Sequence, residues 1–292
     1  MKVGLKRKGS FVTIVLTMMS VKATWGQPPP AVTLREYLDA RLSQRDSTTR
    51  GKPFTSEVCN VDADPLASRV FREYGAIFAA KDTVALPPRC IFNSEEELVR
   101  FQGRLRTKSA VISGVIIELQ EAAMNALLDA IGEIHPRRFA PLDGAIAGRR
   151  NYTDTVRIWN SRFIPALNYW VSKRRLSRED ADEVRIMPVR DQVAKVVEWE
   201  LQGMYFSTNR TRSIFSSVAP PGTSQHLSLL AFDVQQDNDR IIRSALNRHG
   251  WYQTVVGDSP HFTYLGLPEI ELAKRGLVSV ARGGHIYWVP KN

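Results

Sequence analysis

One apolar run that contains a histidine and an aspartate constrains this chain more than any other segment. The run PPGTSQHLSLLAFDV, residues 220–234, opens like a turn with two prolines and a glycine and continues as a candidate buried strand. An ionised Asp233 is costly to bury there unless a cation compensates its charge. A metal ion bound by Asp233, by His226 and by a ligand from elsewhere in the chain would compensate it.

A second stretch supplies the remaining groups of a catalytic metal site. The segment GDSPHFTYLG, residues 257–266, places Asp258 and His261 three residues apart at the start of another strand-like run. A catalytic zinc ion needs three protein ligands and an open fourth position. It also needs a carboxylate that is not a ligand, to take a proton from the attacking water. The sequence therefore predicts His226, Asp233 and His261 as zinc ligands, with Asp258 as the general base.

The two stretches, in this order, resemble the motifs S-x-H-x(6)-D and [DE]-x-x-H of the LAS metallopeptidases. This family includes VanY- and VanX-type D-alanyl-D-alanine peptidases and phage L-alanyl-D-glutamate endopeptidases. Ser224, His226 and Asp233 stand at the matching positions of the first motif, although Leu229 replaces the usual glycine. The resemblance is sharp over residues 220–266, and it implies one zinc ion on the three predicted ligands.

The family also carries an upstream arginine that holds the substrate's carboxylate or polarised carbonyl. The segment GRRNYTDT, residues 148–155, resembles this element loosely and places Arg150 at the arginine, with Tyr152 beside it. Arg149 is adjacent, and either arginine could instead pair with a surface acid. Asp258 also has an alternative interpretation, as a residue that caps the turn before Ser259 and Pro260.

The resemblance implies a zinc peptidase of bacterial cell-wall peptides, with peptidoglycan stem peptides as partners. A D-alanyl-D-alanine carboxypeptidase ranks first, and an endopeptidase ranks second because Asp258 replaces the glutamate of the carboxypeptidases. A non-catalytic zinc-containing module that binds wall peptides is the alternative from another class. Forty basic and thirty acidic residues give a net charge of +10, which is consistent with an anionic wall polymer. We expect no nucleic acid partner, because the aromatic and basic residues of 159–175 are spaced as a helix with an apolar face.

The N-terminus predicts export to the periplasm or the extracellular space. Four basic residues precede the uncharged run FVTIVLTMMSV, residues 11–21, which is too short to span a bilayer. We expect a signal peptide over residues 1–26 and no stable membrane span; a buried N-terminal helix is the alternative. In an oxidising compartment Cys59 and Cys90 could form a disulfide, whereas in a reducing one they would be buried thiols.

The order of the elements predicts an α+β fold, with a small antiparallel sheet that carries the zinc site and helices that flank it. We expect a partly helical N-terminal region over residues 27–100. A peptidase domain follows over 101–292, with a helical insertion at about 156–215. Helices are expected at 34–45, 65–80, 94–105, 120–134, 153–173, 177–203 and 237–250, and strands at 112–120, 227–234, 260–266 and 285–289.

Overall fold

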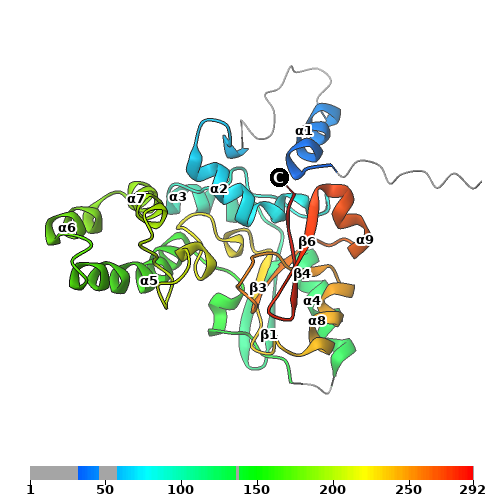
Figure 1. The fold of residues 1–292 in the computed structure, drawn as a ribbon. Helices are drawn as coiled ribbons and strands as arrows, with labels where there is room; N and C mark the ends of the chain where they lie inside the picture. Colours follow the sequence, from blue (N-terminus) through cyan, green and yellow to red (C-terminus); the bar gives the residue numbers. More distant parts are fainter. Residues whose placement is uncertain (1–31, 46–57, 136–137, 292) are drawn as a thin grey trace, which may run out of the picture. The chain divides into compact units, whose positions relative to one another are not determined.

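The computed structural model describes residues 32–45, 58–135 and 138–291 of the chain (Figure 1). The predicted signal peptide, residues 1–26, lies outside the described residues. Among the helices that are described, none is long and apolar enough to cross a membrane.

Most helices begin where a polar side chain caps the first turn. The Asp64 carboxylate accepts from the amide of Leu66, and the Ser94 hydroxyl accepts from the amide of Glu97. The longest helix starts with a capping box between Asn151 and Asp154. The α-helices of the described residues are α1 (Leu34–Arg45), α2 (Pro65–Tyr74), α3 (Glu95–Gln102), α4 (Glu121–Ile134), α5 (Tyr152–Ser172), α6 (Arg178–Ile186), α7 (Val189–Leu201), α8 (Arg240–Arg248) and α9 (Glu269–Leu272).

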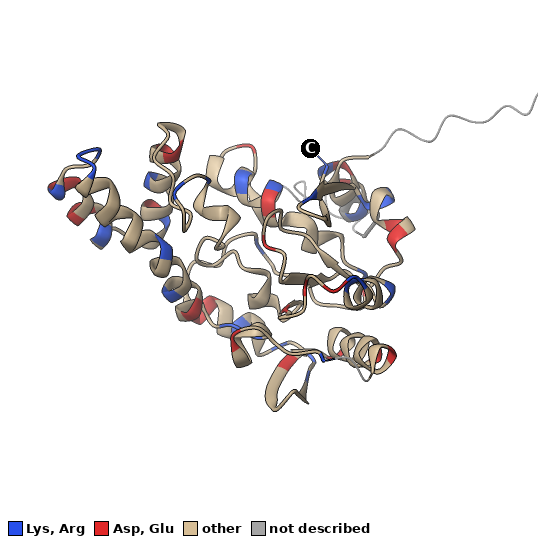
Figure 2. Cartoon of the chain, turned by 60° about the horizontal axis from the view of Figure 1, so that its bottom comes forward, with Lys and Arg blue, Asp and Glu red and all other residues tan. Residues whose placement is uncertain are grey.

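The expected single helix over residues 177–203 is wrong, because the structure divides it into α6 and α7. Pro188 lies at the break and cannot donate the hydrogen bond that a continuous helix needs. Met187 adopts an extended conformation, as residues before proline prefer. Together with α5, these helices make a helical region over residues 152–201. Figure 2 shows both basic and acidic residues along it.

The strands form small antiparallel sheets, which confirms the predicted α+β fold class. A three-stranded sheet has the order β3–β5–β4, and two hairpins pair β1 with β2 and β6 with β7. The strand bounds are β1 (Thr107–Ile112), β2 (Val115–Gln120), β3 (Ala231–Asp233), β4 (Trp251–Gln253), β5 (His261–Tyr264), β6 (Leu277–Arg282) and β7 (His285–Pro290).

Two of the expected strands are interrupted by turns and are shorter than the sequence indicated. The strand expected at residues 112–120 is broken by a tight turn at Ser113 and Gly114, whose φ angles of 49° and 82° suit a two-residue hairpin. The strand expected at 227–234 is reduced to β3, because Gln225–Ser228 forms a 3-10 helix. Leu229 then turns the chain with a left-handed φ of 54°.

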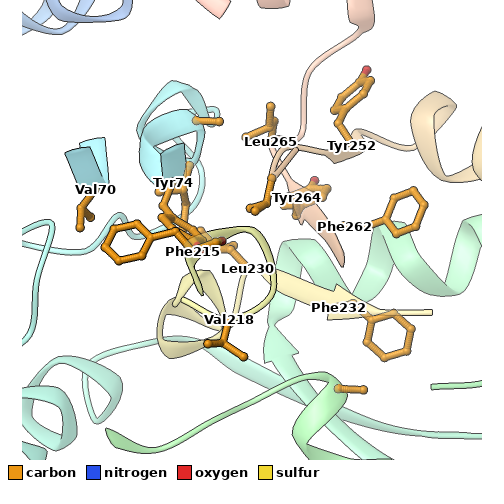
Figure 3. Packing of buried hydrophobic residues seen from close by; sticks show 14 of the residues in the cluster. Val70, Tyr74, Phe215, Val218, Leu230, Phe232, Tyr252, Phe262, Tyr264 and Leu265 are labelled. Atoms are coloured by element: carbon orange, nitrogen blue, oxygen red, sulfur yellow. The ribbon is translucent and has the colours of Figure 1, made fainter. Parts of the chain in front are cut away.

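One hydrophobic core joins the three-stranded sheet to the segments around it. Figure 3 shows Phe232 and Phe262 of neighbouring strands on one side, and Phe215 beside Tyr74 of α2 on the other. Residues Ala31–Asn292 form one compact unit. The segment before residue 100 is part of it, since α2 contacts β7.

The Pro-Pro-Gly turn ahead of His226 is fixed against the segment around Cys90. The amide of Phe92 donates to the carbonyl of Gly222 at 2.8 Å, and Gly222 has a φ of +80°. A Cβ at Gly222 would lie 2.1 Å from the Phe92 carbonyl oxygen, so only glycine fits there. Cys59 and Cys90 form a disulfide, the state that the sequence predicts for an oxidising compartment. The bond closes a 31-residue separation, which in the chain-entropy treatment stabilises the fold by about 4 kcal/mol.

Candidate metal centre

The strand register brings two of the predicted ligands together. In the antiparallel pair of β3 and β5, Asp233 lies directly opposite His261, so both side chains point to the same face of the sheet. His226 comes from the 3-10 helix just before β3. Asp233 of the first motif and His261 of the second therefore lie on neighbouring strands, and His226 precedes them.

The three side chains meet at one buried point. The distances between His226 Nε2, Asp233 Oδ1 and His261 Nδ1 are all 3.1 Å. His226 is fully buried, and His261 and Asp233 are exposed by only 5% and 8%. Donor atoms around a tetrahedral zinc ion, at bond lengths of about 2.0–2.2 Å, lie about 3.3–3.6 Å apart. The observed triangle is therefore close to the size that such an ion requires.

The hydrogen-bond partners of the two imidazoles fix their tautomers. His226 Nδ1 lies 2.8 Å from the carbonyl oxygen of Gly148, which can only accept, so Nδ1 carries the proton. His261 Nε2 lies 2.8 Å from Gln225 Oε1 and donates to it. The orientation of that amide is set in turn, because Gln225 Nε2 donates to the carbonyl of Tyr74. Both remaining ring nitrogens therefore direct a lone pair at the Asp233 carboxylate.

Three lone pairs at 3.1 Å from one another repel unless a cation lies between them. Burial and the nearby Arg150 cation lower the pKa of His226 to about 4, so its imidazole is neutral at neutral pH. Burial opposes the ionisation of Asp233, but the guanidinium of Arg150 favours the carboxylate and helps to hold its pKa well below the usual range. Neutral imidazole and ionised carboxylate are the forms that bind metal. His226, Asp233 and His261 could thus hold a metal ion.

Gln225 and Gly148 are supporting residues that the sequence reading missed. Gln225 is buried and accepts from His261 and from the hydroxyls of Thr254 and Thr263, so it orients one ligand. The carbonyl of Gly148 orients the other imidazole. Such partners fix the tautomer and direction of a ligand. The only sign in the sequence that Gln225 supports the site is its position next to His226. That it contacts His261 and not His226 follows only from the fold.

The two adjacent arginines have different partners. Arg149 points to the hairpin, where it pairs with Glu118 at 2.9 Å. Arg150 points inward and donates from Nη2 to Asp233 Oδ2 at 2.5 Å and from Nε to the carbonyl of Ile146. The structure therefore places Arg150, and not Arg149, at the centre. The contact of Arg150 with substrate stays a prediction. The contact that the structure shows is with Asp233, a candidate metal ligand.

Asp258 lies in the same cavity as the three candidate ligands. The cavity has a volume of about 570 Å³, and Asp258, Arg150 and Ser224 are among its lining residues. Burial, opposed by His261 and reinforced by the charge of Asp233, raises the pKa of Asp258 to about 6. A carboxylate with a pKa near the working pH is suited to general base catalysis.

The other histidines lie outside the centre. His285 is buried and bonds to Gln253, and His249 contacts Glu133 near the end of α8. His135 follows the last residue of α4. No second motif accompanied these residues in the sequence, and their positions agree with a structural role.

Comparison with known proteins finds no matching family model, no matching curated protein and no matching solved structure. The resemblance to the LAS metallopeptidases therefore rests on the sequence motifs alone. The site defines a candidate metal centre of two histidines and one aspartate on a small antiparallel sheet.

The support that Gln225 gives to His261 can be tested directly. We expect Gln225→Met to weaken metal affinity about 10–100-fold, because His261 loses the acceptor that fixes its tautomer. Chelator competition measures this change. Gln192→Met is the matched control, since Gln192 is also buried and hydrogen-bonded, but to Trp159 in the helical region. Equal affinity in the two variants would contradict the role of Gln225.

Proposed function

We propose that this chain is an exported zinc-dependent peptidase of bacterial cell-wall peptides. The observation that carries the proposal is the position of Asp258, which lines the cavity with His226, Asp233 and His261 without belonging to the ligand triangle. Three ligands and a separate carboxylate match the requirements of a hydrolytic zinc site. Two imidazoles and one carboxylate at near-tetrahedral spacing favour zinc over the harder cations, which prefer oxygen ligands.

Each group of the site has a role in peptide hydrolysis. When bound, zinc supplies a Lewis acid for the scissile carbonyl and lowers the pKa of the attacking water to about 7. Asp258 accepts the proton of that water and delivers it to the leaving amine. Gln225 and Gly148 hold the two imidazoles in the required tautomers. Arg150 neutralises the outer oxygen of Asp233 and, as a lining residue, can contact a substrate carbonyl or carboxylate.

The choice of substrate rests on the motif resemblance. A D-alanyl-D-alanine carboxypeptidase remains the first candidate, and the aspartate at position 258 keeps an L-alanyl-D-glutamate endopeptidase as the second. The disulfide between Cys59 and Cys90 supports an oxidising compartment, in agreement with export to the periplasm or beyond.

The proposal is tested by metal analysis and by digestion of cell-wall peptides. We expect purified protein to carry about one zinc ion per chain, and mass spectrometry of a treated pentapeptide muropeptide to show either free D-alanine or an internal cut. Removal of zinc by a chelator should abolish the product, and added zinc should restore it. A zinc-loaded protein that cuts no muropeptide contradicts the peptidase and favours a non-catalytic wall-binding module.

A further inference from the structure

One face of helix α5 forms a wall of the cavity that holds the candidate metal centre. The lining residues from this helix are Arg157, Ile158, Ser161 and Arg162. Arg157 with Ser161, and Ile158 with Arg162, are separated by four positions, which places them on one side of an α-helix. The helical region therefore adds two guanidinium groups to the cavity, and these are remote in sequence from the metal-binding motifs.

Arg162 is a cation without an acidic partner among the residues that the structure describes. Its Nη1 donates to the hydroxyl of Ser161 at 3.0 Å, which leaves its charge uncompensated. Its Nε is buried and has no hydrogen-bond partner. A buried donor without an acceptor carries a free-energy cost.

The other cations of the cavity differ from Arg162. Arg150 is already paired with Asp233 at 2.5 Å. Arg157 is exposed, and its contact with Asp154 at 3.3 Å joins neighbouring turns of α5. An exposed pair of this kind contributes little free energy, so Arg157 can exchange Asp154 for another anion at small cost.

We propose that Arg162 and Arg157 form an anion subsite that holds a carboxylate of an acidic peptide while its scissile bond lies at the metal centre. This inference rests on the proposed peptidase function and adds the class of substrate. A volume of about 570 Å³ lies within the range of about 300–1,000 Å³ for sites that enclose drug-sized ligands. Guanidinium groups suit the role, because they bind carboxylates through paired hydrogen bonds.

A stem peptide offers two sources of that carboxylate, and three synthetic pentapeptides separate them. In L-Ala-γ-D-Glu-L-Lys-D-Ala-D-Ala both the D-glutamate α-carboxylate and the C-terminal carboxylate are free. The second peptide has the D-glutamate carboxylate amidated, and the third has the C-terminus amidated. Calorimetric titration into zinc-loaded Asp258→Asn protein measures binding without turnover. We expect one of the two amidations to weaken binding about 10–100-fold, the range for hydrogen bonds to charged groups.

The arginine variants assign that preference to the α5 wall. We expect Arg162→Gln, in the same background, to lose the preference for the carboxylate and to bind the amidated peptide as before. Arg157→Gln should reduce the preference for the carboxylate less than Arg162→Gln does, and Arg162→Lys should keep part of that preference. Arg185→Gln is the control, because Arg185 lies on α6 and pairs with Asp182. Zinc content, measured in every variant, should not change.

The outcomes separate this inference from the proposed function. Equal affinity for all three peptides, or a preference that survives Arg162→Gln, overturns the anion subsite even if wild-type protein cleaves peptides. Conversely, a carboxylate preference that depends on Arg162, in a protein whose wild type cleaves nothing, supports the subsite and contradicts only the peptidase.

Discussion

Asp258→Asn is expected to retain zinc and to lose about 10²–10⁴-fold of the peptidase rate, which is the usual contribution of a general base. The asparagine amide has nearly the same volume as the carboxylate but cannot accept the proton of the attacking water. Asp258 lies outside the triangle of donor atoms formed by His226, Asp233 and His261, so its replacement should leave metal binding intact. Rates on a pentapeptide muropeptide and zinc content, measured on the same sample, check both expectations.

Two further variants make this result specific. Asp237→Asn is the control, because Asp237 is a buried carboxylate close in sequence to Asp233 that does not line the cavity. It should keep most of the rate. Asp258→Glu distinguishes the two candidate branches: a pocket built around the shorter acid loses activity, whereas a carboxypeptidase-like pocket keeps it. Loss of zinc in Asp258→Asn would make Asp258 a ligand and would contradict its assignment as base.

The pH profile of the wild-type rate should report the ionisation of Asp258. The pKa of Asp258 is raised to about 6, and only its ionised form accepts a proton. The rate should therefore be full above the pKa and fall as the pH drops through it. A bound cation favours the ionised form, so the fall should occur at or below about pH 6. The decline should be absent from the residual activity of Asp258→Asn.

The candidate ligands could be predicted from the sequence because each belongs to a local pattern. His226 and Asp233 lie seven residues apart in one apolar run, and His261 lies at the start of the next strand-like run. Their supporting residues could not be predicted, because those contacts span large sequence separations. Gln225 reaches His261 over 36 positions, and Gly148 reaches His226 over 78. Only the folded backbone decides which amide or carbonyl faces an imidazole.

The difference between local and long-range contacts also explains which helices and strands could be predicted. Helices with clear caps, such as α1 and α3, appear close to their expected bounds, because capping is a local interaction. The wrong strand predictions fall where a short turn interrupts an apolar pattern, at Ser113–Gly114 and at Leu229. Leucine rarely adopts a left-handed φ, so nothing in the residue type marked that turn. Strands β1, β4 and β6 were missed, and β4 is only three residues long and completely buried, without the alternation that marks a strand.

His261→Ala is expected to abolish stoichiometric metal binding, since two of three ligands cannot retain the ion at the affinity of the complete site. His226→Ala should do the same. Zinc that binds only the folded protein stabilises it by about 4 kcal/mol when its concentration is 1,000 times the Kd. For a chain of this size each kcal/mol moves the Tm by about 2–4 °C, so a chelator should lower the wild-type Tm by roughly 10 °C. The chelator should have no effect on the Tm of either variant.

His285→Ala is the matched control, because His285 is buried and hydrogen-bonded to Gln253 but lies outside the triangle. That variant should bind one zinc ion and respond to the chelator as the wild type does. Full zinc content in His261→Ala would show that the ion lies elsewhere, and the two motifs would then have met on neighbouring strands by coincidence.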